Sequence, residues 1–337
     1  MLKLYKILFF NTMIIGTLIS ISAYSWFNMW IGLEINLLSI VPLMKSSKNI
    51  FPAEASLKYF ITQALASTMV LFAVILSLYT SDYIPNNLNY WFMMIMNSAL
   101  LTKLGAAPFH AWFPEVMEGL NWMNNLLLLT WQKLAPMVLI MYNLKMMWLL
   151  IFIIVLSSII GGILGFNQTS LRKIMAYSSI NHISWMLASM LNFKLIWFSY
   201  FLIYTFISIN IIFIFYSLNA FNVTQLFFSL NSNKLIKLLF IFNFLSLGGL
   251  PPFLGFFPKW IVINNLILNH FYALSVILII FTLVTLYFYI RLTFSTLTIS
   301  MTENLIIFSK INNYTMIFLN IFTLLSLFLC TSIFNIF

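Results

Sequence analysis

The chain has 337 residues, of which 63% are hydrophobic and 7% charged, with a net charge of +10 and a mean hydropathy of +1.03. Soluble domains carry about 25% charged residues, so this composition excludes a soluble protein. Long apolar runs without alternation exclude a β-barrel. The sequence therefore indicates an all-α polytopic membrane protein. The positive charges form no basic patch interleaved with aromatic residues, so no nucleic-acid partner is predicted.

In chain order, breaks at charged, Asn-rich and Pro-rich stretches predict eleven transmembrane helices. The N-terminal MLKLYKILFF lacks a following small-residue cleavage site, so it is assigned to the first helix and not to a signal peptide. No linker or soluble domain is evident, and the prediction is one membrane domain, 1–337. The predicted helices are 7–24, 26–44, 58–80, 90–111, 122–143, 147–166, 173–191, 195–218, 236–265, 272–294 and 315–335.

The lysines and arginines outside the helix centres are distributed unevenly between the two sides of this topology. Only Lys145 and Lys194 fall in loops opposite the N-terminus. Positive residues favour the cytoplasm-like side, which predicts the N-terminus there and the C-terminus opposite. The loops on the N-terminal side contain Lys3, Lys6, Lys45, Lys48, Lys58, Arg172, Lys173, Lys234, Lys237, Arg291 and Lys310.

Four charged residues remain inside predicted membrane helices: Glu34, Lys103, Lys133 and Lys259. Each costs roughly 2.5–3.5 kcal/mol at mid-helix, and such groups normally face inward and serve ion or proton transfer. The alternatives are snorkelling to an interface, as for Lys58 and Lys145, or a structural Glu–Lys pair. One glutamate cannot neutralise three lysines, which favours proton transfer. Burial disfavours the ammonium form and a nearby carboxylate favours it, so Lys103 is the predicted switch and Glu34 its modulator.

Two of the predicted helices are interrupted by glycine and proline. The fourth contains LGAAPFH and the ninth contains LGGLPPFLGFFPKW. Backbone breaks at membrane depth persist where they line a polar cavity, and paired breaks point to an internal repeat and its transport site. Since the breaks are five helices apart, the repeats are predicted to be inverted. They would span about 7–143 and 147–294, with 315–335 as an extra helix.

The three histidines lie on separate elements, which does not favour the axial pair of a membrane haem. Helix two matches helix seven in this repeat, so Glu34 corresponds in position to His182. His182 is either a relay group between Lys133 and Lys259 or a simple hydrogen-bonded side chain. His110 follows the first break, and either takes part in the relay or caps free carbonyls. His270 receives no role.

Metal and nucleotide sites are not predicted in this chain. Cys330 is the single cysteine, and iron–sulfur clusters and structural zinc sites need several thiolate or histidine ligands. The glycines at 161–165 fall within a membrane helix and lack the strand–turn–helix context of a phosphate loop.

Six ordered motifs between about residues 26 and 262 resemble the NADH dehydrogenase subunit 2 family of animal mitochondria, antiporter-like membrane subunits of respiratory complex I. The motifs are GLEINLLSIVPL, EASLKYFITQALAS, KLGAAPFHAWFPEVMEGL, LTWQKLAPM, NQTSLRKIMAYSSINHISWM and LSLGGLPPFLGFFPKW. Bacterial relatives carry three more N-terminal helices, and this chain is expected to lack them as animal forms do.

The resemblance implies a proton relay. In that family a glutamate pairs with a lysine of the first broken helix, and these two residues would be Glu34 and Lys103. The next lysine of the relay would be Lys133, and the last one, in the second broken helix, would be Lys259. His182 matches a central histidine position.

The resemblance also implies that the chain is a subunit of an H⁺-translocating NADH:ubiquinone reductase and carries out no redox chemistry itself. NADH, FMN, iron–sulfur clusters and ubiquinone would be bound by other subunits. The partners would be neighbouring antiporter-like subunits, accessory subunits and membrane lipids. The location would be the mitochondrial inner membrane, with the N-terminus in the matrix and the C-terminus on the intermembrane-space side. The alternatives are a stand-alone cation/proton antiporter and a purely structural membrane-arm subunit.

Overall fold

The computed structural model describes residues 4–45, 50–81, 89–144, 146–231, 234–251 and 253–298, together with 318, 320 and 321. Within these ranges the secondary structure is helical apart from turns and one isolated bridge between Ser170 and Asn222. The predicted helix 315–335, except for those three residues, and Cys330 lie outside the described residues. The all-α class predicted from composition is confirmed.

Fourteen helices are present in the described residues. Their bounds are α1 Leu4–Ser22, α2 Trp26–Met44, α3 Phe51–Ser81, α4 Asn89–Leu104, α5 Trp112–Gly119, α6 Trp122–Leu129, α7 Trp131–Tyr142, α8 Met147–Gly165, α9 Leu171–Met190, α10 Lys194–Leu218, α11 Val223–Asn231, α12 Lys234–Gly248, α13 Phe256–Leu268 and α14 Tyr272–Thr298.

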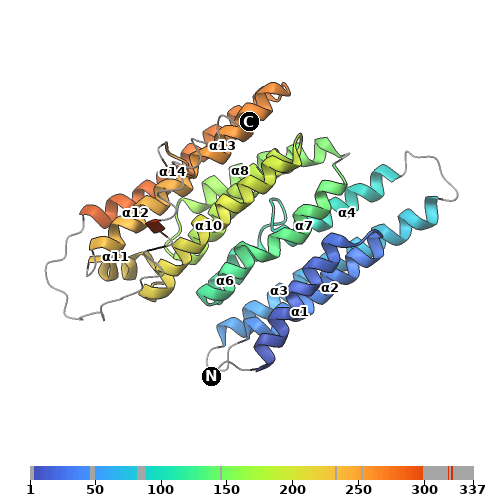
Figure 1. The fold of residues 1–337 in the computed structure, drawn as a ribbon, viewed down its shortest axis with the longest axis horizontal. Helices are drawn as coiled ribbons and strands as arrows, with labels where there is room; N and C mark the ends of the chain where they lie inside the picture. The colour runs from blue at the N-terminus through green and yellow to red at the C-terminus, as the bar shows by residue number, and fades with distance from the viewer. Residues whose placement is uncertain are drawn as a thin grey trace. The chain divides into compact units, whose positions relative to one another are not determined.

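The chain forms two compact units, Met1–Ile153 and Ile154–Phe337, and α8 contains the boundary between them. In the part of the chain described here, seven helical segments are long and apolar enough to cross a membrane, among them α1, α2 and α8. Helices α4, α12 and α13 are shorter because the chain interrupts them. Figure 1 shows the helices with the labels used here.

Small residues bring the first two helices of the first unit together. A Cβ on Gly16 would lie 2.8 Å from the Asn36 nitrogen, and one on Gly32 would lie 2.5 Å from the Ser20 nitrogen. Close backbone approach through glycine is the usual way in which membrane helices pack without a hydrophobic driving force. This contact fixes α2, the helix that carries Glu34, against α1.

A similar contact joins α8 and α9 in the second unit. A Cβ on Gly161 would lie 2.8 Å from the Asn181 nitrogen and 3.0 Å from the Tyr177 oxygen. The corresponding neighbours of Gly16 are the Asn36 nitrogen and the Gly32 oxygen. In both units, then, a glycine of one helix faces the same two groups on the next helix. These groups are the nitrogen of an asparagine and the carbonyl oxygen four residues before it.

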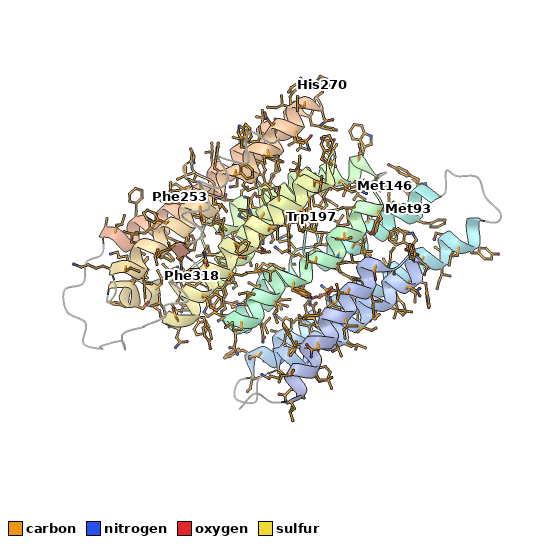
Figure 2. The ribbon with its side chains drawn as sticks, in the orientation of Figure 1. Met93, Met146, Trp197, Phe253, His270 and Phe318 are labelled. Atoms are coloured by element: carbon orange, nitrogen blue, oxygen red, sulfur yellow. The ribbon has the colours of Figure 1, made fainter. Side chains whose placement is uncertain are left out.

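Both predicted breaks are confirmed. The predicted helix 90–111 ends at Leu104, and the predicted helix 236–265 is split between Gly248 and Phe256. Phe253 lies within the second break, and His270 follows the end of α13 (Figure 2). The prediction was wrong in extending helix four to residue 111, because Gly105 takes a left-handed φ of 73° that ends the helix.

The helices differ from the prediction at other places as well. Helix α3 begins at Phe51 and not at 58, with Pro52 and Glu54 in its first turn, where proline and an acidic residue are both favourable. The predicted helix 122–143 is interrupted at Thr130. A short helix, α11, occupies part of the polar stretch 219–235, which was expected to be a loop.

The interruption at Thr130 has local causes. The Thr130 hydroxyl donates to the Leu126 oxygen at 2.7 Å, a back-bond that bends helices. Pro136 lacks the N–H that would bond the carbonyl of Gln132 one turn earlier. Together they weaken the helix on both sides of Lys133.

Candidate functional site

Both broken helices end in the same hydrogen-bonded motif. At the end of α4, the Gly105 nitrogen donates to the Thr102 oxygen at 3.1 Å and the Ala106 nitrogen donates to the Leu101 oxygen at 3.1 Å. This pair of bonds around a left-handed glycine is a Schellman motif. It leaves Lys103 in the last turn of α4, where the negative end of the helix dipole favours a cation.

Helix α12 ends in the same way. The Gly249 nitrogen donates to the Ser246 oxygen at 2.9 Å, and the Leu250 nitrogen donates to the Leu245 oxygen at 3.3 Å. Gly249 has a φ of 78°. The chain then turns through the break and begins α13 at Phe256, which places Lys259 in the first turn of that helix.

Donors from the helix after each break bind carbonyls at the end of the helix before it. In the first unit, the indole nitrogen of Trp112 donates to the Thr102 oxygen at 3.0 Å. In the second unit, the Lys259 ammonium donates to the Gly248 oxygen at 2.7 Å and to the Leu247 oxygen at 3.3 Å. The breaks therefore expose carbonyls, and a buried cation satisfies them in the second unit.

Lys103 and Glu34 interact through their charges. The Lys103 side chain is 8% exposed, and Glu34 is half-buried on α2. The Glu34 carboxylate acts electrostatically on the Lys103 ammonium, without forming a direct ion pair within 4 Å among the described residues. The pairing of Glu34 with Lys103 and the role of Glu34 as modulator therefore stay predictions.

Lys133 is the most deeply buried of the three lysines, with 2% of its side chain exposed. It lies just after the interruption at Thr130, and its ammonium is 5.8 Å from the centre of the Phe113 ring. Cations are attracted to aromatic faces at such distances. Each predicted lysine therefore lies within a few residues of a helix interruption.

Lys259 is 7% exposed. Its ammonium lies 6.0 Å from the centre of the Trp185 ring on α9. A Cβ on Gly249 would come within 2.7 Å of the Lys259 Cδ and 2.8 Å of its Nζ. Only a glycine leaves room for this lysine to reach the carbonyls of α12.

His182 is 5% exposed and bonds to a tyrosine. Its Nδ1 lies 2.9 Å from the hydroxyl of Tyr200, and its ring centre lies 5.0 Å from that of Tyr204. Both tyrosines come from α10, one helical turn apart. A cavity of about 10 Å³ is lined by His182, both tyrosines, Ser246 and Leu247.

The hydroxyls of the serines that flank His182 in sequence bond to backbone carbonyls of their own helix. Ser178 and Ser179 donate to carbonyls three residues earlier in α9, as does Ser184. The hydroxyl that contacts the His182 ring comes from another helix, α10, and the choice between a relay group and a simple hydrogen-bonded side chain stays open. Tyr200 and Tyr204 were missed because tyrosines in an apolar helix resemble ordinary core residues.

His110 is half-buried after the first break. Its Nδ1 lies 3.2 Å from the Pro108 oxygen, and its own oxygen accepts from the Phe113 nitrogen at 2.9 Å. The His110 ring thus lies against a carbonyl oxygen at the break, and its role stays a prediction. His270 has a left-handed φ of 63° and an exposed contact of 2.9 Å with the Tyr272 hydroxyl.

A reciprocal amide pair, absent from the predicted site, joins α2 and α7. The Asn36 side chain donates to the Gln132 oxygen at 3.0 Å, and Gln132 donates back to the Asn36 oxygen at 2.9 Å. Asn36 lies two residues after Glu34, and Gln132 directly precedes Lys133. Uncharged amides inside apolar helices were the available signal, since buried amides also need partners.

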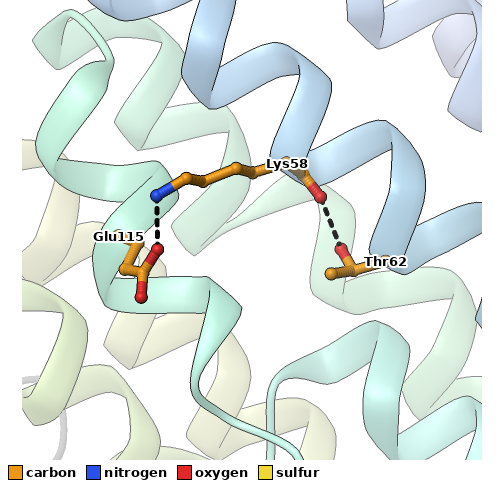
Figure 3. A network of polar contacts seen from close by, with 3 residues as sticks. All are labelled: Lys58, Thr62 and Glu115. Carbon is orange, nitrogen blue, oxygen red and sulfur yellow. Dashed lines mark hydrogen bonds and ion pairs between the residues drawn. The ribbon is translucent and has the colours of Figure 1, made fainter.

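An exposed ion pair lies on the same unit (Figure 3). The ammonium of Lys58 on α3 is 2.5 Å from a carboxylate oxygen of Glu115 on α5, and the side chains are 54% and 56% exposed. Thr62 donates to the Lys58 oxygen at 3.1 Å. Lys58 therefore places its ammonium at the protein surface, whereas Lys103, Lys133 and Lys259 are buried. Exposed ion pairs of this kind contribute little to stability.

Comparisons with known proteins agree on the family. A family model described as NADH:quinone oxidoreductase/Mrp antiporter, TM, matches residues 23–286. NADH-ubiquinone oxidoreductase chain 2 of Anopheles gambiae is 46% identical over 306 residues, which cover 90% of this chain and 89% of that protein.

Two solved structures share the fold. A chain of respiratory complex I from Thermus thermophilus has a TM-score of 0.87 at 21% identity, covering 98% of this chain and 79% of that one. A chain of the Mrp complex from a Dietzia species has a TM-score of 0.73 at 16% identity, covering 83% of this chain and 58% of that one. Taken with the identity to the mosquito protein, these likenesses identify the chain as a member of the NADH-ubiquinone oxidoreductase chain 2 family.

Proposed function

We propose that this chain is a proton-translocating membrane subunit of respiratory complex I in the mitochondrial inner membrane. The observation that carries the proposal is the position of Lys103, Lys133 and Lys259. Each is more than nine-tenths buried and lies beside a helix interruption. A buried ammonium is costly in a membrane, and a break supplies the carbonyls and space that let such a group exchange a proton.

The proposed route starts at Lys103, which receives a proton from the matrix side while Glu34 tunes its charge. It continues through Lys133 and His182 to Lys259, in the order that the family resemblance implies. His110 is assigned to carbonyl capping by its contact with Pro108. NADH, FMN, iron–sulfur clusters and ubiquinone are proposed to bind to other subunits, which couple to this chain through altered electrostatics along the membrane arm.

The proposed topology places the N-terminus in the matrix and the C-terminus on the opposite side, following the distribution of lysines and arginines. Neighbouring antiporter-like subunits, accessory subunits and lipids are the proposed partners of its membrane surface.

We further propose that the two units are inverted copies of one ancestral unit. Support comes from the shared contacts of Gly16 and Gly161 and from the shared Schellman motifs at Gly105 and Gly249. The residues after both motifs also recur, since Pro108, Phe109, Phe113 and Pro114 reappear in order and spacing as Pro252, Phe253, Phe257 and Pro258.

The register favoured by the glycine contacts differs from the sequence-based one. It sets Asn181 at the position of Asn36. His182 then takes the place of Leu37, not that of Glu34. In this proposed register the helices of Glu34 and His182 correspond, and the two residues are offset by one helical turn.

Substitution of Lys103 by methionine tests the relay. In purified complex reconstituted into liposomes, K103M is expected to assemble and to lose proton pumping coupled to NADH oxidation, because methionine fills the space and cannot carry a proton. The matched control is K234M, which changes a lysine that is exposed on α12. Normal proton stoichiometry in K103M, with normal assembly, would show that Lys103 is not part of the relay.

A further inference from the structure

A small polar cavity borders Lys103 in the first unit. Its volume is about 20 Å³, and its polar lining consists of Asn36, Tyr59, Gln63, Lys103 and Gln132. A buried water needs roughly 10–15 Å³ and two to four polar partners. The cavity therefore has room for one water and the chemistry to hold it.

Gln63 has a buried donor without a partner at this cavity. The side chain is 4% exposed, and its amide nitrogen makes no hydrogen bond to the residues that the structure describes. Such a group costs free energy unless it bonds to something. Gln63 lies on α3 one turn after Tyr59, so both side chains are on the face of α3 that lines the cavity.

The neighbouring amides cannot easily serve Gln63, because they bond to each other. Asn36 and Gln132 form the reciprocal pair, and the Tyr59 hydroxyl adds a long contact of 3.5 Å to the Gln132 oxygen. The Asn36 oxygen accepts one hydrogen bond among the described residues, from Gln132, and still has a second lone pair. The pair can therefore accept a hydrogen bond from a water while staying intact.

Lys103 is the second donor at the cavity. It interacts through its charge with Glu34, and no hydrogen bond joins it to the part of the chain that the structure describes. A buried ammonium needs acceptors. The cavity thus brings together two donors without a hydrogen bond to the described residues, Gln63 and Lys103, and one amide oxygen, that of Asn36, which can accept once more.

We propose that one water is bound between the Gln63 amide nitrogen and the Lys103 ammonium, and that Gln63 is a positioning residue for proton exchange at Lys103. The water oxygen accepts from both donors, and one of its hydrogens points to the Asn36 oxygen. In this arrangement the water is the immediate partner for a proton that reaches or leaves Lys103. The proposal rests on the proposed relay and deepens it by giving α3 a part in it.

The second unit has no glutamine at the position that corresponds to Gln63. In the register set by the glycine contacts, Tyr204 takes the place of Tyr59 and Ser208 that of Gln63. Ser208 donates to the Thr205 oxygen of its own helix at 2.9 Å. The cavity there is about 10 Å³. The water site is accordingly specific to the unit that contains Lys103.

The first test is Gln63→Leu in intact complex reconstituted into liposomes. Leucine preserves the approximate volume and removes both hydrogen-bonding atoms. We expect normal assembly, a several-fold lower coupled pumping rate, a changed dependence of that rate on pH, and a changed ratio of rates in H₂O and D₂O. The matched control is Gln168→Leu, because the Gln168 amide donates to the Leu164 oxygen in an exposed contact of 3.1 Å. This variant should leave all four readouts unchanged.

The outcomes separate this proposal from the relay itself. If K103M abolishes pumping while Q63L keeps the wild-type rate, pH profile and isotope ratio, the water site is wrong and the relay stands. If K103M pumps normally, the relay is wrong. If Q63L fails to assemble, a density map of the wild-type complex that resolves ordered water decides. A peak within hydrogen-bond distance of Gln63 and Lys103 supports the proposal, and a protein atom filling the cavity overturns it.

Discussion

Lys259 is held by the end of another helix and not by an acidic residue. Its ammonium binds the carbonyls of Leu247 and Gly248, which are charge-assisted hydrogen bonds and stronger than neutral ones. Lys103 instead borders a cavity that also contains amide groups. The proposed first and last lysines of the relay therefore rest in different surroundings, one beside a space for water and the other bound directly to backbone.

Gly249→Ala tests whether this contact positions Lys259. Alanine at a φ of 78° costs about 1–2 kcal/mol, and its Cβ would lie 2.7 Å from the Lys259 Cδ. The lysine must move away from the carbonyls, so we expect assembled complex with reduced pumping, measured in liposomes. Gly162→Ala is the control, since its Cβ would meet neighbours no closer than 3.5 Å. Equal pumping by the two variants would contradict the expectation.

Tyr200→Phe tests the partner of His182. Loss of the hydroxyl removes a buried bond of 2.9 Å and costs about 1 kcal/mol. If His182 carries protons, its orientation then relaxes and the pumping rate should fall, with a changed pH profile. Tyr272→Phe is a close control because it removes a 2.9 Å bond to an exposed histidine, His270. Wild-type pH profiles for both variants would argue against a relay role for His182.

At the scale of elements, the contact between α1 and α2 is the clearest target. Gly32→Val should force these helices apart, because a Cβ there would lie 2.5 Å from the Ser20 backbone nitrogen. Overpacking of this kind costs about 1–3 kcal/mol, and more against backbone that cannot move. We expect little assembled complex on native gels. Gly248→Ala, with neighbours at 3.6 Å or farther, should assemble normally, and normal levels of the valine variant would refute the argument.

The breaks in the membrane helices could be predicted because glycine and proline act locally. Gly105 and Gly249 take left-handed angles that terminate α4 and α12, and the sequence shows both glycines followed by proline. The interruption at Thr130 was missed, since its causes are a threonine back-bond and a proline six residues later. Neither is a strong breaker alone, and prediction by composition treats such a segment as continuous.

The charged members of the site could also be predicted, because a lysine inside an apolar run is conspicuous. The uncharged side chains that surround these residues could not be predicted. Asn36 and Gln132 come from helices far apart in the sequence, whereas His182 and Tyr200 come from the consecutive helices α9 and α10. Single-sequence patterns indicate which face of a helix is polar, but they do not say which neighbouring helix supplies the partner.

At the scale of the whole molecule, the two units share a scaffold and differ in their ionisable groups. In the proposed register, the first unit has Lys103 at its cavity and the second has Leu247 at the same place. Conversely, the second unit has His182 at the position where the first unit has Leu37. One architecture of glycine contacts and Schellman motifs can thus present different proton-carrying side chains, which suits a relay whose successive groups need different proton affinities.

The purified chain alone in liposomes should show no exchange of Na⁺ or K⁺ for protons. A metal cation that approached Lys103 or Lys259 would meet a buried ammonium, and repulsion between like charges is strong where water is excluded. The positive control for the assay is complex I reconstituted in parallel, which should pump protons when NADH and quinone are added. Cation-dependent proton movement by the chain alone, abolished by Lys103→Met, would instead favour a stand-alone antiporter. A proton leak that survives the Lys103→Met substitution would reflect damaged membranes and would not count as exchange. The reason is that proton transfer through Lys103 is required both by the proposed relay and by a stand-alone antiporter.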